Sequence, residues 1–251
     1  MKTCFIIPAR LNSDRFPNKL LQSLGGIKII DRVLNIAKAC KPDKIVLATD
    51  SKYLETLYKD DIDVLLMNEE EVWCGSQRAY YVWKKYPKYN YYITIPSDEP
   101  MIDSEELQKS LSDYFKGKTD LIATMVSDWG IHDLERYRSS CSCKVITSGN
   151  YILYFSRAAV PCSKDGSNSM EYSKKHLGVF VFANKLFKKY GDKAWSNYFG
   201  SIAKAEGLEQ TIFLENGFKV RYISIIHPLY GVDTIEDFQQ LEVKFDNNKR
   251  S

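Results

Sequence analysis

The chain lacks the features that mark several large classes of protein. Its three histidines lie far apart and its six cysteines form no C-x-x-C pair, so we expect neither a zinc site nor a disulfide framework, and we take the thiols as reduced. The formal net charge of +3 is too small to indicate a nucleic-acid surface. No apolar run approaches the length of a membrane span, and the apolar start of the chain is too short for a signal peptide. These absences predict a cytoplasmic protein that binds neither nucleic acid nor membranes.

Apolar segments instead alternate with amphipathic ones through the first half of the chain. Apolar runs predict strands at 2–8, 44–49, 63–67, 91–96 and 120–127. Helical periodicity predicts helices between them, at 28–40, 51–59, 76–86 and 104–116. This alternation is typical of an α/β protein with a mostly parallel central sheet and helices on both faces.

The pattern changes after residue 127. Residues 128–175 are polar and irregular around a predicted hairpin, 143–148 and 151–156. The remaining segments predict a strand at 177–183, helices at 184–190 and 207–216, a strand at 218–226 and a last helix at 234–246. Because no repeat or linker interrupts the chain, we expect a single domain, 1–251, in which 128–183 forms a small inserted β-rich lobe. The 163–175 segment, rich in small polar residues, is expected to be mobile; whether it acts as a lid is open at this stage.

A loop with three cations directly follows the first predicted strand. It combines small residues with cations spaced to converge, namely Ala9, Arg10, Ser13, Arg15 and Lys19. A triphosphate needs backbone N–H groups at close range and cations that reach several oxygens. Open α/β sheets bind ligands at the carboxyl ends of their strands. A polyphosphate-binding loop is therefore favoured over a solvated basic surface loop.

Two aspartates also follow predicted strands. Asp98 lies where Pro100 prevents entry into a helix. Asp233 precedes the last helix, but Thr234 and Asp237 already form a capping box there, which leaves Asp233 spare. Two carboxylates at what we expect to be neighbouring strand ends, facing a cationic loop, are the oxygen ligands that Mg²⁺ takes together with substrate phosphates. The pair predicts a magnesium site and nucleotidyl transfer, with a turn aspartate and a second helix cap as the alternative.

These segments, with others in the same order, resemble a known family. The matching motifs run from about Phe5 to about Leu241 and resemble those of the 3-deoxy-manno-octulosonate (KDO) cytidylyltransferases, the CMP-KDO synthetases: Pro8-Ala9-Arg10, Ser13-Asp14-Arg15, Pro17-Asn18-Lys19, Ala48-Thr49-Asp50, Gly75-Ser76-Gln77-Arg78, Asp98-Glu99-Pro100, Tyr154-Phe155-Ser156-Arg157-Ala158, His176-Leu177-Gly178, Leu208-Glu209-Gln210 and Gly231-Val232-Asp233-Thr234. An ordered set this long is more specific than any single motif.

The resemblance implies a Rossmann-like nucleotidyltransferase fold, usually dimeric, with 128–183 as the acceptor and dimer lobe. It implies a Mg²⁺-dependent reaction of lipopolysaccharide biosynthesis that joins CTP to the C2 hydroxyl of an acidic sugar and releases pyrophosphate. The nucleotide would be contacted by Ala9, Arg10, Ser13, Arg15, Lys19, Ser76 and Arg78. The metal would be held by Asp98 and Asp233, which with Lys19 and Arg10 form the expected catalytic set. The sugar would face Arg157, His176, Glu209 and Gln210.

Taken without the family pattern, the sugar-side residues have simpler explanations. His176 fits a hydrogen-bonded histidine at the start of a strand, and Arg157 fits a surface ion-pair partner. Glu209 and Gln210 open a predicted helix, where an acidic residue is favourable. The assignment of these four residues to sugar binding therefore depends on the order of the family motifs.

The chain departs from the family pattern mainly on the acceptor side. Pro96 and Ser97 stand where the family usually has Gln-Gly, and Phe180, Phe182 and Ile212 replace residues that are often Tyr, Tyr and Arg. The predicted acceptor is therefore KDO or a modified KDO such as an amino-deoxy form. Two alternatives remain, a sialic-acid-type CMP-sugar synthetase and a catalytically inactive nucleotide-binding relative. A sugar-1-phosphate nucleotidyltransferase would need a further basic cluster in the second lobe, and none stands out.

Overall fold

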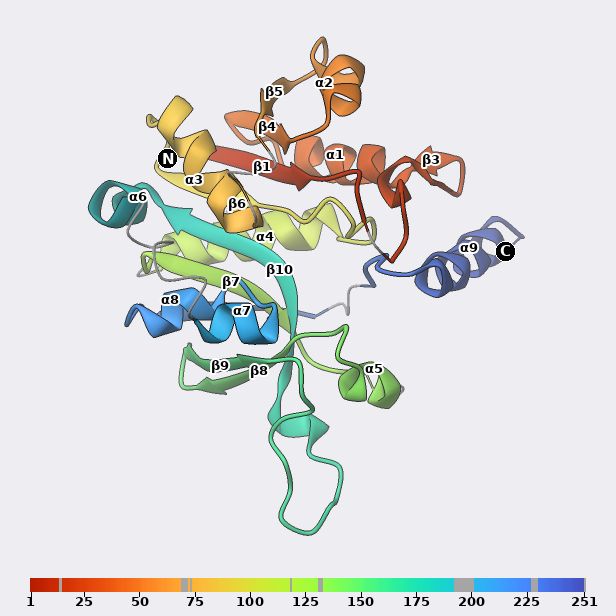
Figure 1. Cartoon of the computed structure of the whole chain (residues 1–251), viewed down its shortest axis with the longest axis vertical. Coiled ribbons are helices and arrows are strands. Elements are labelled where there is room, and N and C mark those ends of the chain that lie inside the picture. Colours follow the sequence, from red (N-terminus) through yellow and green to blue (C-terminus); the bar gives the residue numbers. More distant parts are fainter. Residues whose placement is uncertain are drawn as a thin grey trace.

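The computed structural model of the chain describes residues 1–13, 15–68, 72, 74–117, 119–130, 133–191, 201–226 and 230–250, with the backbone alone at 244 and 246–250. Within these residues, nine strands form one mixed sheet in the order β5-β4-β1-β6-β10-β7-β11-β9-β8 (Figure 1). No helix formed by the described residues is long and apolar enough to cross a membrane. His132 and His227 lie outside the described residues, as does Asp14 of the cationic loop.

Four strands at one end of the sheet run parallel, namely β5 (Asp63–Leu66), β4 (Lys44–Thr49), β1 (Thr3–Ala9) and β6 (Tyr91–Thr94). Beyond them, β7 (Ile122–Ser127) and β11 (Val220–Ile225) are parallel to each other. The hairpin of β8 (Lys144–Ser148) and β9 (Tyr151–Ser156) joins the other end. A separate two-stranded ribbon is made by β2 (Ser23–Leu24) and β3 (Ile27–Lys28).

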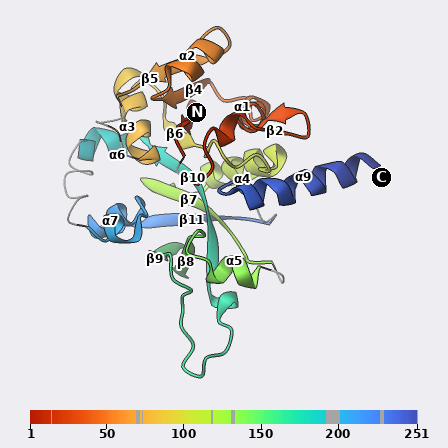
Figure 2. The same cartoon turned by 45° about the vertical axis from the view of Figure 1, so that its right-hand side comes forward.

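Helices cover both faces of the sheet. The longer ones are α1 (Ile29–Ala39), α3 (Gly75–Lys85), α4 (Ser104–Lys116) and α9 (Ile235–Arg250). The shorter ones are α2 (Lys52–Tyr58), α5 (Leu134–Arg138), α6 (Asn184–Tyr190), α7 (Ile202–Glu206), α8 (Thr211–Glu215) and the 3-10 turns η1 (Lys19–Leu21) and η2 (Met170–Tyr172). Figures 1 and 2 show β8, β9 and the segment around η2 extending from one end of the molecule.

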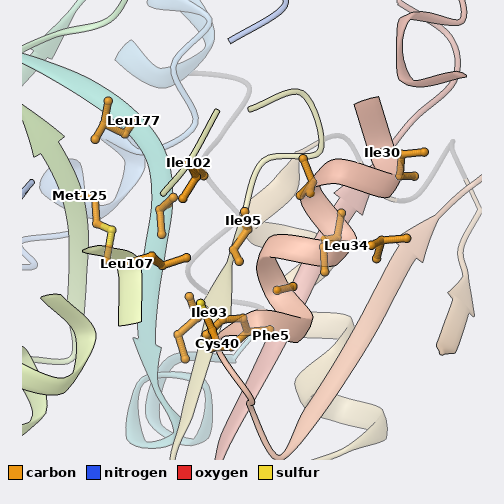
Figure 3. Packing of buried hydrophobic residues seen from close by; sticks show 14 of the residues in the cluster. Phe5, Ile30, Leu34, Cys40, Ile93, Ile95, Ile102, Leu107, Met125 and Leu177 are labelled. Carbon is orange, nitrogen blue, oxygen red and sulfur yellow. The ribbon is translucent and has the colours of Figure 1, made fainter. Parts of the chain in front are cut away.

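The strand period of two divides the core between the faces. In β1, Phe5 and Ile7 pack in a cluster with α1 and α4, whereas Cys4 and Ile6 pack in a second cluster with α3 and α6. Figure 3 shows part of the first cluster, to which Phe5 and Ile93 of the sheet, Leu34 of α1 and Leu107 of α4 all contribute. Burial on both faces explains why the central strands are continuous apolar runs.

The direction of one central strand differs from the parallel arrangement expected there. Strand β10 (Lys174–Ala183) lies between β6 and β7 and runs antiparallel to both. Its run from Leu177 to Ala183 is buried apart from Gly178, so its apolar pattern indicates burial but carries no information on direction. The strand also begins earlier than the predicted residue 177, because Lys174 and Lys175 pair with β8.

The helix predicted at 207–216 is wrong at its start. Gly207 adopts a left-handed conformation (φ 63°) and ends α7, and α8 begins only at Thr211. Glu209 therefore lies in the connection between two short helices instead of opening one. Asp103 caps α4, because its Oδ1 accepts hydrogen bonds from the N–H groups of Glu105 and Glu106.

Candidate active site

The carboxyl ends of β1 and β6 open onto a cavity of about 610 Å³. Its walls come from the loop after β1, the start of α3, the turn 96–99, the segment 139–143 and the strand β10. Every predicted site residue except Ser76 lines it. None of the residues 158–174 lines the cavity.

The two aspartates predicted to hold a metal converge on one lysine. Lys19 Nζ donates to Asp98 Oδ2 (2.5 Å) and to the carbonyl of Val232 (2.8 Å), and it lies 3.5 Å from Asp233 Oδ1. Burial disfavours the ammonium, but the two carboxylates outweigh it and raise the pKa of Lys19. The capping box that leaves Asp233 spare is present, since Asp237 Oδ2 accepts from the N–H groups of Asp233 and Thr234.

The aspartates meet although their strands are not neighbours. Asp98 follows β6 and Asp233 follows β11, and the sheet order puts β10 and β7 between these strands. The chain after β11 returns across the strand ends, where the N–H of Val232 donates to the carbonyl of Asp98 (2.9 Å). The expectation of neighbouring strand ends is therefore wrong, while the convergence of the side chains is present.

Two arginines of the loop after β1 face the same cavity in different states. Arg15 donates through Nη2 to Asp233 Oδ1 (3.0 Å) and through Nη1 to Cys141 Sγ (3.2 Å). Arg10 is exposed, and its guanidinium has no partner in the described part of the chain. Among the described residues, the loop therefore offers one cation without a partner, Arg10, and two, Arg15 and Lys19, that neutralise the carboxylates.

Donor chemistry fits these carboxylates to Mg²⁺. Among the described residues, no group of three or more His, Cys, Asp or Glu could hold a metal ion by itself. Mg²⁺, however, is usually bound through one or two carboxylates together with substrate phosphates. The ammonium of Lys19, held by both Asp98 and Asp233, shows that the space between them attracts positive charge.

A third carboxyl group was not singled out from the sequence. Glu99 Oε2 is buried and has no hydrogen-bond partner in the described structure. Burial raises the pKa of Glu99 to about 8, which Lys175 opposes and Asp98 and Asp233 reinforce. The glutamate is visible beside Asp98 in the sequence, but no local pattern indicates that it is buried among these charges.

The start of α3 joins the two sides of the cavity. Cys74 Sγ accepts from the N–H of Gln77 and caps the helix. Glu209 Oε1 accepts from the N–H and the hydroxyl of Ser76 (3.0 and 2.7 Å). Ser76, expected near the nucleotide base, and Glu209, expected near the sugar, are thus in direct contact, which explains why Ser76 itself does not line the cavity.

Arg78 projects from the same helix turn. Its Nη2 pairs with Asp50 Oδ2 at 2.6 Å, and both side chains are at most 9% exposed. Its Nη1 is buried and has no partner in the described structure. The guanidinium therefore keeps an unused donor beside the cavity, as a residue expected to contact the nucleotide would require.

Hydrogen bonds hold His176 as a neutral ring. Thr124 Oγ1 donates to the carbonyl of Val179 and contacts His176 Nε2 (2.8 Å), which assigns the ring proton to Nε2. Nδ1 then accepts from Gln210 Nε2 (3.5 Å). Burial lowers the pKa of His176 to about 3. The histidine accordingly orients Gln210 and has no proton to supply near neutral pH.

Arg157 lies at the cavity edge with most of its donors already used. The guanidinium donates to backbone carbonyls of four residues, Ser140, Cys141, Glu206 and Gly207. Since a guanidinium has five N–H groups, one remains for a ligand. The simpler explanation of a surface ion pair is wrong, because its partners are carbonyls.

Comparison with known proteins shows the family of the chain. The family model for cytidylyltransferases matches residues 4–225. The 3-deoxy-manno-octulosonate cytidylyltransferase of Fusobacterium nucleatum subsp. nucleatum is 31% identical over 246 residues, which cover 96% of each chain. The mitochondrial 3-deoxy-manno-octulosonate cytidylyltransferase of Arabidopsis thaliana is 30% identical over 94% of this chain and 81% of that one.

Solved structures show the fold. A CMP:2-keto-3-deoxy-manno-octonic acid synthetase complexed with CTP superposes with a TM-score of 0.80 at 22% identity, covering 99% of this chain and 100% of that one. An inositol-1-phosphate CTP transferase from T. maritima superposes with a TM-score of 0.64 at 13% identity, covering 98% and 96%. These likenesses show an α/β nucleotidyltransferase fold. By its family model and its relatives, the chain belongs to the cytidylyltransferase family, in the group of the 3-deoxy-manno-octulosonate cytidylyltransferases.

Proposed function

We propose that this protein transfers the cytidylyl group of CTP to the C2 hydroxyl of KDO, or of a closely related acidic 3-deoxy sugar, and releases pyrophosphate. The relatives named above carry out, by their names, this class of reaction. The observation that carries the proposal within this chain is the convergence of Asp98 and Asp233 on Lys19, beside the loop that holds Arg10 and Arg15.

On the nucleotide side, the cations of the loop bind the triphosphate. Arg10 is free to meet phosphate oxygens, and Arg15 and Lys19 can exchange their carboxylate partners for phosphates at little electrostatic cost. Backbone at Ala9 and Ser13 and the spare donor of Arg78 complete the nucleotide contacts. Mg²⁺ held by Asp98 and Asp233 would supply charge neutralisation at the α-phosphate and the departing pyrophosphate.

On the acceptor side, the residues act through shape and hydrogen bonding. Gln210, oriented by His176, presents its amide oxygen to sugar hydroxyl groups. Glu209 offers its second carboxylate oxygen, and Arg157 its remaining N–H. Because His176 is neutral, we assign no general-base role to it, and the acceptor hydroxyl is activated by its position in line with the α-phosphate.

The proposal includes a single domain that works as a homodimer. The 128–183 region contributes both the acceptor-side wall of the cavity and exposed apolar side chains, Leu153 (59% exposed) and Tyr172 (70% exposed). Such side chains suit a contact with a second copy of the chain.

Pyrophosphate release tests the reaction directly. Purified protein is incubated with CTP and MgCl₂ and with KDO, an amino-deoxy KDO or N-acetylneuraminic acid, and Asp98→Asn protein serves as the control for contaminating enzymes. Turnover with KDO or the amino-deoxy acid, absent in the control, supports the proposal, and the better of the two identifies the acceptor. Preference for N-acetylneuraminic acid would assign a sialic-acid-type enzyme instead. No release with any acid would indicate an inactive relative.

A further inference from the structure

Two cations hold four consecutive backbone carbonyls in the turn 139–142. Lys144 Nζ donates to the carbonyls at the two ends, Ser139 (2.6 Å) and Ser142 (2.7 Å). Arg157 Nη1 donates to the two between them, in Ser140 and Cys141 (3.1 and 3.0 Å). We call this arrangement the carbonyl clamp. It pulls every carbonyl of the turn towards the two cations.

The clamp places a charge where the fold alone would favour an apolar residue. The side chain of Lys144 is fully buried in β8, and no carboxylate lies within ion-pair distance of it among the described residues. Burying an ammonium without a counter-ion is costly, and apolar replacement of buried charges is often stabilising. Stability of the sheet therefore does not account for a lysine here. Its specific effect is to fix the conformation of the turn.

Arg157 extends the clamp to a second segment of the cavity wall. Its Nε and Nη2 donate to the carbonyls of Glu206 (3.2 Å) and Gly207 (3.1 Å), and its backbone N–H donates to the Glu206 carboxylate (2.8 Å). Residues 207–210 follow directly and line the cavity. One side chain thus fixes the 139–142 turn relative to the segment that carries Glu209 and Gln210.

Three of the four residues of the clamped turn line the cavity. Ser139, Cys141 and Ser142 all line it, and Cys141 Sγ receives the hydrogen bond from Arg15. A thiol is a weak acceptor, so the influence of the clamp on Arg15 is small compared with its influence on the wall itself. The position of this wall sets the space available to an acceptor.

We propose that Lys144 and Arg157 are positioning residues that fix the acceptor-side wall of the active site, acting through the 139–142 and 207–210 segments. Neither contributes its charge to the reacting atoms. This inference rests on the proposed cytidylyl transfer for its kinetic test, but it also predicts a structural consequence that needs no turnover. Loss of the clamp affects use of the acceptor and leaves CTP binding nearly unchanged.

The test compares Lys144→Met and Arg157→Lys with wild-type protein, and Lys174→Met is the matched control. Lys174 occupies the adjacent strand β10 beside Val145, but its Nζ pairs with the exposed Asp128 and does not touch the turn. Arg157→Lys keeps the charge while a single ammonium cannot reach four carbonyls. With the best acceptor of the panel, both variants are expected to lose at least about tenfold in kcat/KM for the acceptor, with the KM for CTP within threefold of wild type.

Hydrogen–deuterium exchange provides the second readout. Peptides covering 139–143 and 207–210 are expected to exchange faster in both variants and at the wild-type rate in Lys174→Met protein. Unchanged exchange in these peptides, acceptor kinetics like those of the control, or an equal rise of both KM values would each overturn the positioning role. If Lys144→Met protein does not fold, the exchange of the 139–143 and 207–210 peptides in Arg157→Lys protein decides, because the acceptor kinetics of that variant also reflect the contact of Arg157 with the sugar. Absence of wild-type turnover would refute the proposed function, and the exchange data would still report on the clamp.

Discussion

The two sides of the cavity hold their polar groups by different means. On the nucleotide side, Lys19 and Arg15 are paired with Asp98 and Asp233, whose side chains are 31% and 39% exposed. On the acceptor side, Lys144 and Arg157 are bonded to backbone carbonyls. A side-chain ion pair can exchange partners when a charged ligand arrives, whereas a bond to a carbonyl within a turn is part of the fold.

This difference matches what each side would have to bind. A metal–triphosphate group brings its own charges, so a site of mutually neutralising ion pairs can open and reform around it without a large change in net charge. A sugar offers mainly hydroxyl groups and a fixed shape, and recognition then depends on preorganised donors and acceptors. The nucleotide side therefore holds charges that can exchange partners, whereas the acceptor side holds groups whose positions are fixed by hydrogen bonds to the backbone.

The largest effect is expected from neutralising a carboxylate of the nucleotide side. Asp98→Asn or Asp233→Asn should reduce kcat by roughly 10²- to 10³-fold or more, because an amide is a poor ligand for Mg²⁺ beside a triphosphate. Asp128→Asn, which alters an exposed surface pair, is the control for the loss of one charge. Steady-state pyrophosphate release measures the effect. Activity of either variant near that of the control would show that the metal is held elsewhere.

The next largest effect concerns the lysine between the carboxylates. Lys19→Met should raise the KM for CTP by roughly 10- to 100-fold, since a hydrogen bond to a charged group contributes about 1.5–3 kcal/mol. The KM for the acceptor should change little if the two sides are as separate as their contacts indicate. Lys44→Met, which removes a lysine paired with Asp63 on the edge of the sheet, is the control. A matching rise in both KM values would remove the distinction between the sides.

The sequence is informative about elements and about charged groups that follow strand ends. The position of Asp98 after a strand and the Thr234–Asp237 cap could be predicted, because each depends on residues close in the chain. Strands such as 44–49 agree with the structure because a run buried on both faces is apolar throughout. The direction of β10 could not be predicted, because a buried strand has the same apolar pattern whether it runs parallel or antiparallel to its neighbours.

Long-range partners explain most of what the sequence could not reveal. Arg157 matches a motif expected to bind an acid, yet its observed partners are carbonyls, and a carbonyl leaves no trace in the side-chain pattern. Ser76 and Glu209 are 133 positions apart, and only the fold brings them into contact. Lys144 resembles any other lysine of a strand until its complete burial is known.

Glu209 provides a further test of this comparison, because it links the 207–210 segment of the acceptor side to α3. Glu209→Ala should lower the free energy of unfolding by about 1–3 kcal/mol, since the N–H and hydroxyl of Ser76 lose a charged acceptor at a helix N-terminus. Glu209→Gln keeps an acceptor oxygen and should recover part of that loss. Urea unfolding of the three proteins measures the difference. Equal stability of the alanine variant and wild type would mean that the link does not contribute to the fold.

Lys144 is also expected to make the stability of the protein depend on pH. Burial lowers the pKa of Lys144 to about 8 in the folded protein, reinforced by Arg157 and opposed by Cys143, Glu206 and Cys141. The unfolded chain, with the ordinary lysine pKa of about 10.4, therefore binds more protons between pH 8 and pH 10. Linkage then requires the contribution of Lys144 to stability to rise with pH across this window.

The measurement is the difference in unfolding free energy between wild-type and Lys144→Met protein, because cysteines and tyrosines titrate in the same range in both. From pH 7.5 to pH 10 the difference should shift in favour of wild type by up to about 2–3 kcal/mol. Lys174→Met protein is the control for the loss of a lysine from the neighbouring strand. A constant difference across the window would place the Lys144 ammonium in contact with water, and the rigid wall would then lack one of its two supports.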